Sequence, residues 1–326
     1  MATKDMSATL RENEKRPENG IRAVLIAGPT ASGKSALAIE LAERLNGVVL
    51  NADSMQLYRE LSIVTARPPQ EDLDRIAHRL YGVLPSSHAF STGQWLRMME
   101  AELETVRAEG KLPILVGGTG LYFKSLTEGF ADLPEIDPDI RQDCRKLAED
   151  GGVNAVRDAL MPLDRQAAET LEDLQRLTRA LEVVRSTGKR LADWQRDAQS
   201  APLIDPGSAL RIVLTPPRPW LHERIALRAG LMLSEAGIAE VEALLALELP
   251  DSLPAMRAIG VKEVASYLAG DMTMEEAAEK LTVATRQYAK RQETWFRNQM
   301  ADWQGFDPST AKVQDLAERI LGGIDG

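Results

Sequence analysis

Eight consecutive residues near the N-terminus have the composition of a phosphate-binding loop. Two glycines stand five positions apart, and a lysine and a serine close the run, in the order Gly28, Pro29, Thr30, Ala31, Ser32, Gly33, Lys34 and Ser35. The glycines let the backbone curl so that successive amide N–H groups point at one anion, and a following helix adds a partial positive charge. Lys34 supplies a mobile cation, and the Ser35 hydroxyl can bind Mg²⁺. The segment predicts a polyphosphate ligand without saying which one.

The neighbouring segments give this loop the context that it requires. Residues 22–27 form a short apolar run that predicts a buried strand, and the residues after the loop are apolar at helical spacing. Further segments alternate in the same way: strands at 48–50 and 112–116, a helix over 91–109 with Trp95, Met98 and Met99 toward the core, and the start of a helix over 121–126. Strand and helix in alternation predict an α/β fold with a parallel sheet.

The pattern changes at about residue 132. A connection rich in Pro and Asp leads into purely helical patterns, an apolar strand returns at 211–214, and the chain after Pro219 is helical nearly to its end. We therefore predict a P-loop NTPase-like parallel sheet core that begins in residues 21–131. An all-helical insertion domain follows over 132–200, and residues 201–326 complete the core and add a helical C-terminal part. Residues 1–20 are polar and charged, which predicts a disordered extension.

The composition restricts the class of protein. No run of about 18 apolar residues is present, which argues against a membrane span. The lone cysteine, Cys144, has no partner for an internal disulfide or a metal cluster, which favours a reducing, cytoplasmic compartment. The net charge of −10 argues against nucleic-acid binding when taken alone. Basic residues nevertheless cluster over 176–190 and 286–297, and binding requires only a local basic patch.

One carboxylate follows a predicted strand. In common P-loop enzymes an Asp after an apolar strand helps to hold Mg²⁺. Here the apolar strand at 112–116 runs into Gly117-Gly118-Thr119-Gly120 instead, and Asp53 is the acid that follows a strand. The carboxyl ends of parallel strands form the ligand crevice of such sheets, which predicts a functional role for Asp53.

Five segments in chain order resemble one family, the tRNA dimethylallyltransferases, also called tRNA isopentenyltransferases. They are GPTASGKS at 28–35, NADSMQLYR at 51–59, PILVGGTGLY at 113–122, QRLTRALEV at 175–183 and TRQYAKRQETWFR at 285–297. The segments span nearly the whole folded chain, and the chain resembles the bacterial type because it has no Cys/His zinc finger. It departs from the common family pattern at Arg67, where many members have Lys, and at Val261, where many have Tyr.

The resemblance implies a reaction. A dimethylallyl group would pass from dimethylallyl diphosphate to the N6 amine of the adenosine 3′-adjacent to the tRNA anticodon, releasing diphosphate. The phosphate loop would hold the prenyl diphosphate rather than ATP, with Mg²⁺ as cofactor bound by Ser35, and the enzyme would be a monomer. The implied catalytic residues are Asp53, as the base, with Thr119 and Arg224, while Arg228 joins the diphosphate site. Arg224 and Arg228 are four positions apart and share one helix face.

The resemblance also implies a set of tRNA contacts. They are Asp53, Ser54, Met55, Gln56, Thr119, Arg141, Gln175, Arg176, Leu177, Thr178, Arg179, Arg257, Lys262, Arg286 and Lys290. The target adenosine must leave its stack to expose N6, and the Gln56 amide is a candidate reader of its Watson–Crick edge. The rings of Tyr288 and Trp295 are predicted to anchor the core rather than to stack on bases.

Two other functions remain open from the residues themselves. A P-loop kinase of a small metabolite would explain the phosphate loop and the α/β alternation, but not the helical insertion or the basic C-terminal helix. A non-catalytic RNA-binding or GTPase-like switch should show guanine-specifying residues such as Asn-Lys-x-Asp after a strand, and the sequence contains none.

Overall fold

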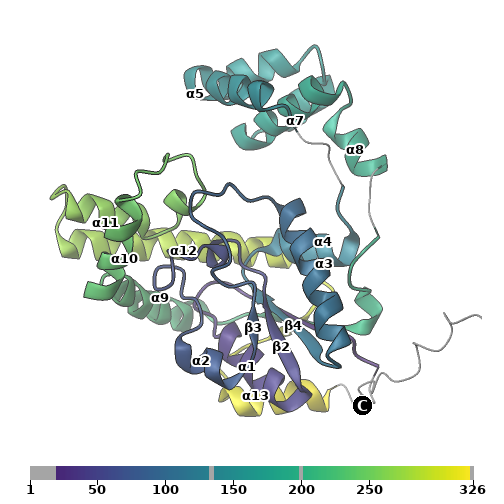
Figure 1. The fold of residues 1–326 in the computed structure, drawn as a ribbon, viewed down its shortest axis with the longest axis vertical. Helices are drawn as coiled ribbons and strands as arrows, with labels where there is room; N and C mark the ends of the chain where they lie inside the picture. The colour runs from purple at the N-terminus through teal and green to yellow at the C-terminus, as the bar shows by residue number, and fades with distance from the viewer. Residues whose placement is uncertain (1–19, 132–135, 198–200, 324–326) are drawn as a thin grey trace, which may run out of the picture. The chain divides into compact units, whose positions relative to one another are not determined.

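A computed structural model describes residues 20–131, 136–197 and 201–323 of the chain. The chain divides into two compact units (Figure 1). The core unit combines Met1–Thr127 with Ile204–Gly326, and the helical unit is Glu128–Leu203. The helical unit covers the segment predicted as an insertion. Of the predicted N-terminal extension, all but Gly20 lies outside the described residues.

Six parallel strands form the centre of the core unit, in the order β3-β2-β4-β1-β5-β6. Their bounds are β1 Ala23–Ala27, β2 Gly47–Asn51, β3 His78–Arg79, β4 Leu112–Gly117, β5 Ala209–Leu214 and β6 Gln304–Phe306. β1, β2 and β4 are buried along their whole length, as expected of parallel strands that are covered on both faces. The predicted parallel α/β fold is confirmed.

The two edge strands are not predicted from the sequence. β3 has two residues, both half-buried, and β6 has three, two of them exposed. Neither carries an apolar run or a clear alternation, so no local pattern marks them. The prediction of helix through the C-terminal region is wrong at β6, which pairs with β5 about 90 residues earlier in the chain.

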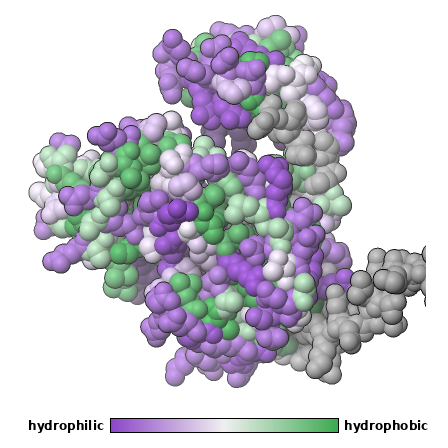
Figure 2. All heavy atoms as spheres, viewed as in Figure 1, coloured by the Kyte–Doolittle hydropathy of each residue, from purple (hydrophilic) through white to green (hydrophobic). Residues whose placement is uncertain are grey.

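The remaining elements of the core unit are helices. They are α1 Lys34–Leu45, η1 Met55–Leu57, α2 Gln70–Arg75, α3 Thr92–Ala108, α4 Gly120–Glu128, η2 Pro206–Ser208, α9 Arg218–Met232, α10 Glu235–Leu245, η3 Ala255–Arg257, α11 Val261–Leu268, α12 Met274–Gln299 and α13 Val313–Gly322. Helices such as α1 and α13 pack on the sheet. The predicted helices at 91–109 and 121–126 correspond to α3 and α4. Within the described residues, no helix is both long and apolar enough to cross a membrane. Figure 2 shows apolar residues among hydrophilic ones over the α9–α11 region.

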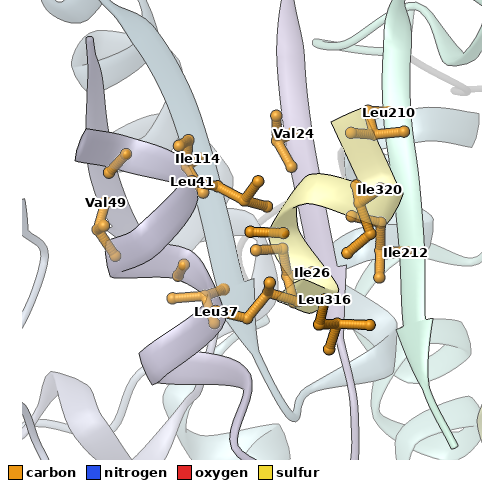
Figure 3. Packing of buried hydrophobic residues seen from close by; sticks show 14 of the residues in the cluster. Val24, Ile26, Leu37, Leu41, Val49, Ile114, Leu210, Ile212, Leu316 and Ile320 are labelled. Atoms are coloured by element: carbon orange, nitrogen blue, oxygen red, sulfur yellow. The ribbon is translucent and has the colours of Figure 1, made fainter. Parts of the chain in front are cut away.

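One apolar layer fixes the phosphate loop to the sheet (Figure 3). Val24 and Ile26 of β1 point to the same side, because side chains alternate along a strand, and they pack with Leu37 and Leu41 of α1. α13 adds Leu316 and other side chains from the C-terminal end of the chain. Both β1 and α1, which flank the phosphate loop, are therefore anchored in the core.

On α3, a capping box at Ser91 and Gln94 defines the start of the helix. The buried Trp95 follows, and its indole Nε1 donates a hydrogen bond to Asn51 O at 3.2 Å. The Trp95 ring stacks on Tyr122 of α4 with ring centroids 3.9 Å apart. Met99 is buried as predicted, whereas Met98 is only partly buried. α3 thus fixes the end of β2 at Asn51, two residues before Asp53.

The helical unit has its own core. Its helices are α5 Pro138–Leu160, α6 Arg165–Thr170, α7 Leu174–Thr187 and α8 Leu191–Asp197. Aspartates at 137, 164 and 173 cap the first three, each accepting from a backbone N–H. Leu160, Leu177 and Leu181 pack around the buried Cys144. The single thiol therefore fills space in this core, where burial raises its pKa.

The contact between the ends of β2 and β4 gives the first prediction. A methyl group on Gly117 would overlap the backbone carbonyl of Ala52, which cannot move without shifting β2. We expect Gly117→Ala to lower the free energy of unfolding by about 2 kcal/mol or more, as measured by urea unfolding. Gly230→Ala is the matched control, since a methyl group there meets open space on α9 and should raise the free energy by up to about 1 kcal/mol. Equal stability of the two variants would contradict the close approach.

Candidate active site

Residues 28–35 form a curled loop between β1 and α1, which we call the phosphate loop. Ala31 and Gly33 have φ of 63° and 87°, and this left-handed backbone turns the chain into the helix. A methyl group on Gly28 would lie 2.8 Å from Ser32 Oγ and 3.1 Å from Leu214 Cβ, so only glycine fits there. The buried Ser32 Oγ has no hydrogen-bond partner among the described residues. The loop thus keeps one buried hydroxyl without a protein partner, which an anion could satisfy.

Lys34 lies against its own loop. Its Nζ donates to Pro29 O at 3.2 Å. Burial of the ammonium lowers the pKa of Lys34 to about 8, the negative charge of Asp53 opposes this shift, and the positive charge of Arg228 adds to it. A cation held in this way is stabilised when an anion arrives.

Two arginines of α9 reach the phosphate loop. Arg224 Nε donates to Ala31 O at 2.8 Å, and its guanidinium lies 4.7 Å from the centre of the Trp220 ring. Arg228 donates to Thr30 Oγ1 and, at 3.1 Å, to Val64 O. Its buried Nε has no partner among the described residues, and burial lowers its pKa while Asp53 opposes the shift. The fold thus brings Arg224 and Arg228, the two arginines predicted at this site, to a loop that lies about 190 residues earlier in the chain.

Asp53 follows the end of β2 and is partly exposed. Asn51 Oδ1 accepts the Asp53 N–H at 2.8 Å, and Asp53 Oδ1 accepts the Met55 N–H at 3.0 Å, so both backbone and carboxylate are held. Burial, followed by the charge of Asp53, raises the pKa values of three phenols, Tyr81, Tyr122 and Tyr288. The negative charge of Asp53 thus acts on both cations of the site and on these three phenols.

Thr119 belongs to the glycine loop, residues 117–120, between β4 and α4. Its Oγ1 accepts the Ser54 N–H at 3.0 Å and lies 3.4 Å from Ser54 Oγ. Its backbone N–H donates to Ala52 O at 3.3 Å. These bonds join the glycine loop to the segment that carries Asp53, so the two predicted residues Asp53 and Thr119 lie at one end of the sheet.

Gln292 of α12 lies at this site, although the sequence analysis gave it no role. Its side chain is 6% exposed, its Oε1 accepts the Thr30 N–H at 2.8 Å, and its Nε2 donates to Gly118 O at 2.9 Å. The signal that could have found it is a glutamine on the buried face of α12, in step with Thr285, Ala289 and Phe296.

Glu240 of α10 is the second residue that the sequence analysis missed. Its carboxylate accepts three consecutive backbone N–H groups, those of residues 62–64, at 2.7 to 2.9 Å. The segment after them supplies Thr65 O and Ala66 O, and Gln56 Nε2 donates to both at 2.9 Å. These bonds occupy the Nε2 donors of the Gln56 amide, so the prediction that Gln56 reads the Watson–Crick edge of the adenosine would in this conformation depend on its Oε1 as an acceptor.

The remaining predicted tRNA contacts of the core unit are surface residues. Arg286 and Lys290 are exposed on α12, four positions apart as predicted. Arg257 of η3 and Lys262 of α11 are also exposed. Ser54 and Met55 lie beside Asp53. Tyr288 and Trp295 are partly buried; the Trp295 ring fits against Gly120, where a methyl group would overlap it, which suits packing better than base stacking.

In the helical unit, the predicted contacts differ in exposure. Gln175 and Arg176 are exposed on α7, and Arg141 on α5 is partly exposed. Arg179 pairs with Glu182 at 3.1 Å. Leu177 is fully buried and Thr178 is buried with its hydroxyl bonded to Leu174 O, so the prediction of direct contact is wrong for these two side chains. The spacing of α7 turns both toward the core of the unit.

The site has no cluster of acidic metal ligands. The described residues contain no group of three or more His, Cys, Asp or Glu side chains placed to hold a metal ion. Ser35, in the first turn of α1, is exposed beside the loop. Magnesium characteristically keeps several waters and binds through one or two protein groups together with substrate phosphates, so this donor set fits a phosphate-bound Mg²⁺.

Known proteins resemble the chain over nearly all of its length. The profile of the IPP transferase family matches residues 56–299. The chain is 48% identical over 297 residues to a tRNA dimethylallyltransferase of Agrobacterium fabrum, covering 90% of this chain and 99% of that protein. It is 51% identical over 286 residues to one of Rhizobium etli, covering 86% and 96%.

Solved structures show the same resemblance. A tRNA isopentenylpyrophosphate transferase from Bacillus halodurans aligns with a TM-score of 0.67 at 34% identity, covering 93% of this chain and 97% of that chain. A eukaryotic dimethylallyltransferase described as acting on tRNA aligns with a TM-score of 0.74 at 26% identity, covering 91% and 75%. With the phosphate loop, Asp53 and the glycine loop assembled at one sheet end, the chain belongs to the IPP transferase family, the family of the tRNA dimethylallyltransferases.

Proposed function

We propose that this protein transfers a dimethylallyl group from dimethylallyl diphosphate to the N6 amine of the adenosine 3′-adjacent to the anticodon of a tRNA. The observation that carries the proposal is the placement of Asp53. Its charge acts on Lys34 of the phosphate loop and on Arg228 of α9, which donates to Thr30 of that loop, so the carboxylate influences both cations of the proposed diphosphate site. The family membership and the tRNA-acting relatives support this assignment.

The phosphate loop binds the leaving group. Backbone N–H groups at the start of α1, together with Lys34, Arg224 and Arg228, face the diphosphate and offset the charge that grows as the C1–O bond breaks. The unpartnered Ser32 Oγ and Arg228 Nε gain partners from phosphate oxygens. Mg²⁺, held by Ser35 and the diphosphate, supplies further charge neutralisation when bound.

Asp53 acts on the nucleophile. The lone pair of the adenosine N6 is delocalised into the ring, so a base that takes the N6 proton lowers the barrier. As the N6–C1 bond forms, the proton passes to the Asp53 carboxylate and the electron pair of the C1–O bond leaves with the diphosphate. In this proposal Thr119, whose Oγ1 accepts the N–H of Ser54 beside the base, contacts the extruded adenosine.

The tRNA binds through basic side chains of both units in this proposal. Arg286 and Lys290 on α12, and Arg176 and Arg141 in the helical unit, are suited to phosphate contacts that position the anticodon arm. We further propose that the enzyme works as a monomer in the cytoplasm, as the family resemblance implies.

A small-metabolite kinase is not favoured. The relatives at 48–51% identity bear the name tRNA dimethylallyltransferase. The phosphate loop alone fits either activity, so incubation with ATP in place of the prenyl donor separates them.

Replacing the base while preserving its shape tests the chemistry. We expect Asp53→Asn to lower kcat about 10²–10⁴-fold, because the amide can still accept the Met55 N–H but cannot take a proton. Isopentenyl-adenosine in digested tRNA is measured by mass spectrometry, with Mg²⁺ and dimethylallyl diphosphate present. Asp205→Asn is the matched control, because Asp205 Oδ1 also accepts the N–H two residues on, from Gly207 at 3.1 Å, but lies before the start of β5, at the end of the sheet opposite to the phosphate loop. No product from the unmutated protein, together with ADP from ATP, would overturn the proposal.

The lowered pKa of Lys34 predicts a pH dependence of diphosphate affinity. Below its pKa of about 8 Lys34 is charged, and above it the ammonium loses its proton, so affinity falls as pH rises. We expect the Kd for inorganic diphosphate to rise by up to about tenfold per pH unit above pH 8, measured by calorimetry. In Lys34→Arg, whose cation stays charged, the Kd should lack this rise. A constant ratio of the two Kd values from pH 7 to 9.5 would refute the role of Lys34.

Two arginines of the helical unit should report on tRNA binding. Arg176 and Arg141 have no carboxylate within ion-pair distance in the described part of the chain, whereas Arg196 pairs with Asp193 at 2.8 Å and with Asp197 at 3.2 Å. We expect Arg176→Ala and Arg141→Ala each to weaken tRNA binding and to reduce the slope of log K against log salt by about 1. Arg196→Ala should leave that slope unchanged. Identical slopes in all variants would exclude these phosphate contacts.

A further inference from the structure

The Gln292 side chain connects two loops that lie far apart in sequence. Its amide oxygen accepts from Thr30 N–H in the phosphate loop, and its amide nitrogen donates to Gly118 O in the glycine loop. Both bonds are buried, and the two partners are 262 and 174 residues away from Gln292 in the chain. One side chain therefore ties together the ends of β1 and β4.

Each of the two loops carries a different part of the reaction. Thr30 belongs to the diphosphate site, and its hydroxyl receives a hydrogen bond from Arg228. Gly118 precedes Thr119, whose hydroxyl is bonded to Ser54 beside Asp53. Gly118 also closely approaches the base itself, because a methyl group there would lie 3.2 Å from Asp53 Oδ2 and would overlap Gln292 Nε2. The Gln292 amide lies between the leaving-group side and the base side.

The chemistry of this position requires an amide. One partner is a backbone donor and the other a backbone acceptor, and a neutral amide of this length satisfies both at once. An aliphatic side chain would leave both buried groups unpaired, and a carboxylate would place a negative charge against Gly118 O and Asp53. α12 holds the side chain in place, since Ala289 and Phe296 are buried on the same helix face and Trp295 packs on Gly120.

We propose that Gln292 is a positioning residue that sets the distance between the diphosphate site and Asp53. The inference rests on the proposed function. In-line attack requires that the N6 amine, the C1 carbon and the leaving oxygen be aligned, so the separation of the base and the phosphate loop limits the rate of prenyl transfer. Gln292 acts on that separation through Thr30 and Gly118 and does not itself contact the reacting atoms.

Single-turnover kinetics distinguish positioning from stability, because the rate constant does not depend on the fraction of protein that is folded. With excess enzyme and saturating dimethylallyl diphosphate, we expect Gln292→Leu to lower the rate constant of prenyl transfer about 10²-fold. Its tRNA affinity should stay within about threefold of the unmutated protein. Gln299→Leu is the matched control, because Gln299 ends the same helix and links it to Lys124 by an exposed hydrogen bond at 2.6 Å. Its rate should change less than about threefold.

Gln292→Glu supplies a second, pH-dependent test. Burial and the nearby Asp53 raise the pKa of the introduced carboxyl, which can donate to Gly118 O only when protonated. Its rate relative to the unmutated protein should therefore rise as pH falls from 8.5 to 6, whereas the ratio for Gln292→Leu should stay flat. This test also decides the case if the leucine variant does not fold.

The outcomes separate the inference from the function on which it rests. Unchanged rates for both Gln292 variants, or a loss no larger than that of Gln299→Leu, would overturn the inference while leaving the proposed function in place. A flat pH ratio for Gln292→Glu would also count against it. If the unmutated protein formed no isopentenyl-adenosine, the proposed function would fail and this inference with it.

Discussion

The interaction of one carboxylate with two half-buried cations is the constraint on which the arrangement of the site depends. Lys34 and Arg228 are both destabilised as charges by burial, and Asp53 is the negative group that opposes this effect for each. One carboxylate does not balance two cations, so the site keeps an excess of positive charge. In the proposed function a diphosphate supplies the missing negative charge and gives hydrogen-bond partners to Ser32 Oγ and Arg228 Nε, which have none among the described residues.

This charge arrangement requires elements from the whole length of the core unit. Lys34 lies at the start of α1, directly after the loop that follows β1, and Asp53 follows β2. Arg228 lies on α9, which comes after the helical unit in the chain. Close backbone packing keeps them in register: Gly117 leaves no space against Ala52, and Gly118 none against Gln292. Glu240 also fixes a segment of the site. Its carboxylate accepts three N–H groups of residues 62–64, which holds Val64 O where Arg228 donates to it.

The helical unit has a different design. Its core is a small set of leucines and valines around Cys144, and its surface charges are largely arranged in local pairs, such as Arg190 with Asp193 and Lys189 with Asp197. A cation that already pairs with a carboxylate is less available to an RNA phosphate. Candidate nucleic-acid contacts are therefore better chosen by the exposure and the pairing of each basic side chain than by the number of basic residues. The negative net charge of the chain is compatible with tRNA binding because binding requires only a local group of exposed, unpaired basic side chains.

The phosphate loop, the strands β1, β2, β4 and β5, and the presence of Asp53 and Thr119 after strand ends could all be predicted from the amino-acid sequence. These features depend on short-range patterns: a glycine spacing, an apolar run, or a polar residue that follows one. The positions of Arg224 and Arg228 on one helix face follow from helical periodicity in the same way.

Contacts between residues that are distant in the chain could not be predicted in this way, because they depend on how the elements pack. β6 forms because Gln304–Phe306 finds β5, and Leu177 is excluded from RNA because α7 packs that face inward. In the sequence, Gln292 and Glu240 look like any other polar residues on helices. Their roles arise because the fold places backbone N–H groups from other segments against their side chains. A hydrogen bond between groups 262 residues apart leaves no periodic trace in the sequence, since its geometry exists only once both segments have packed on the same sheet.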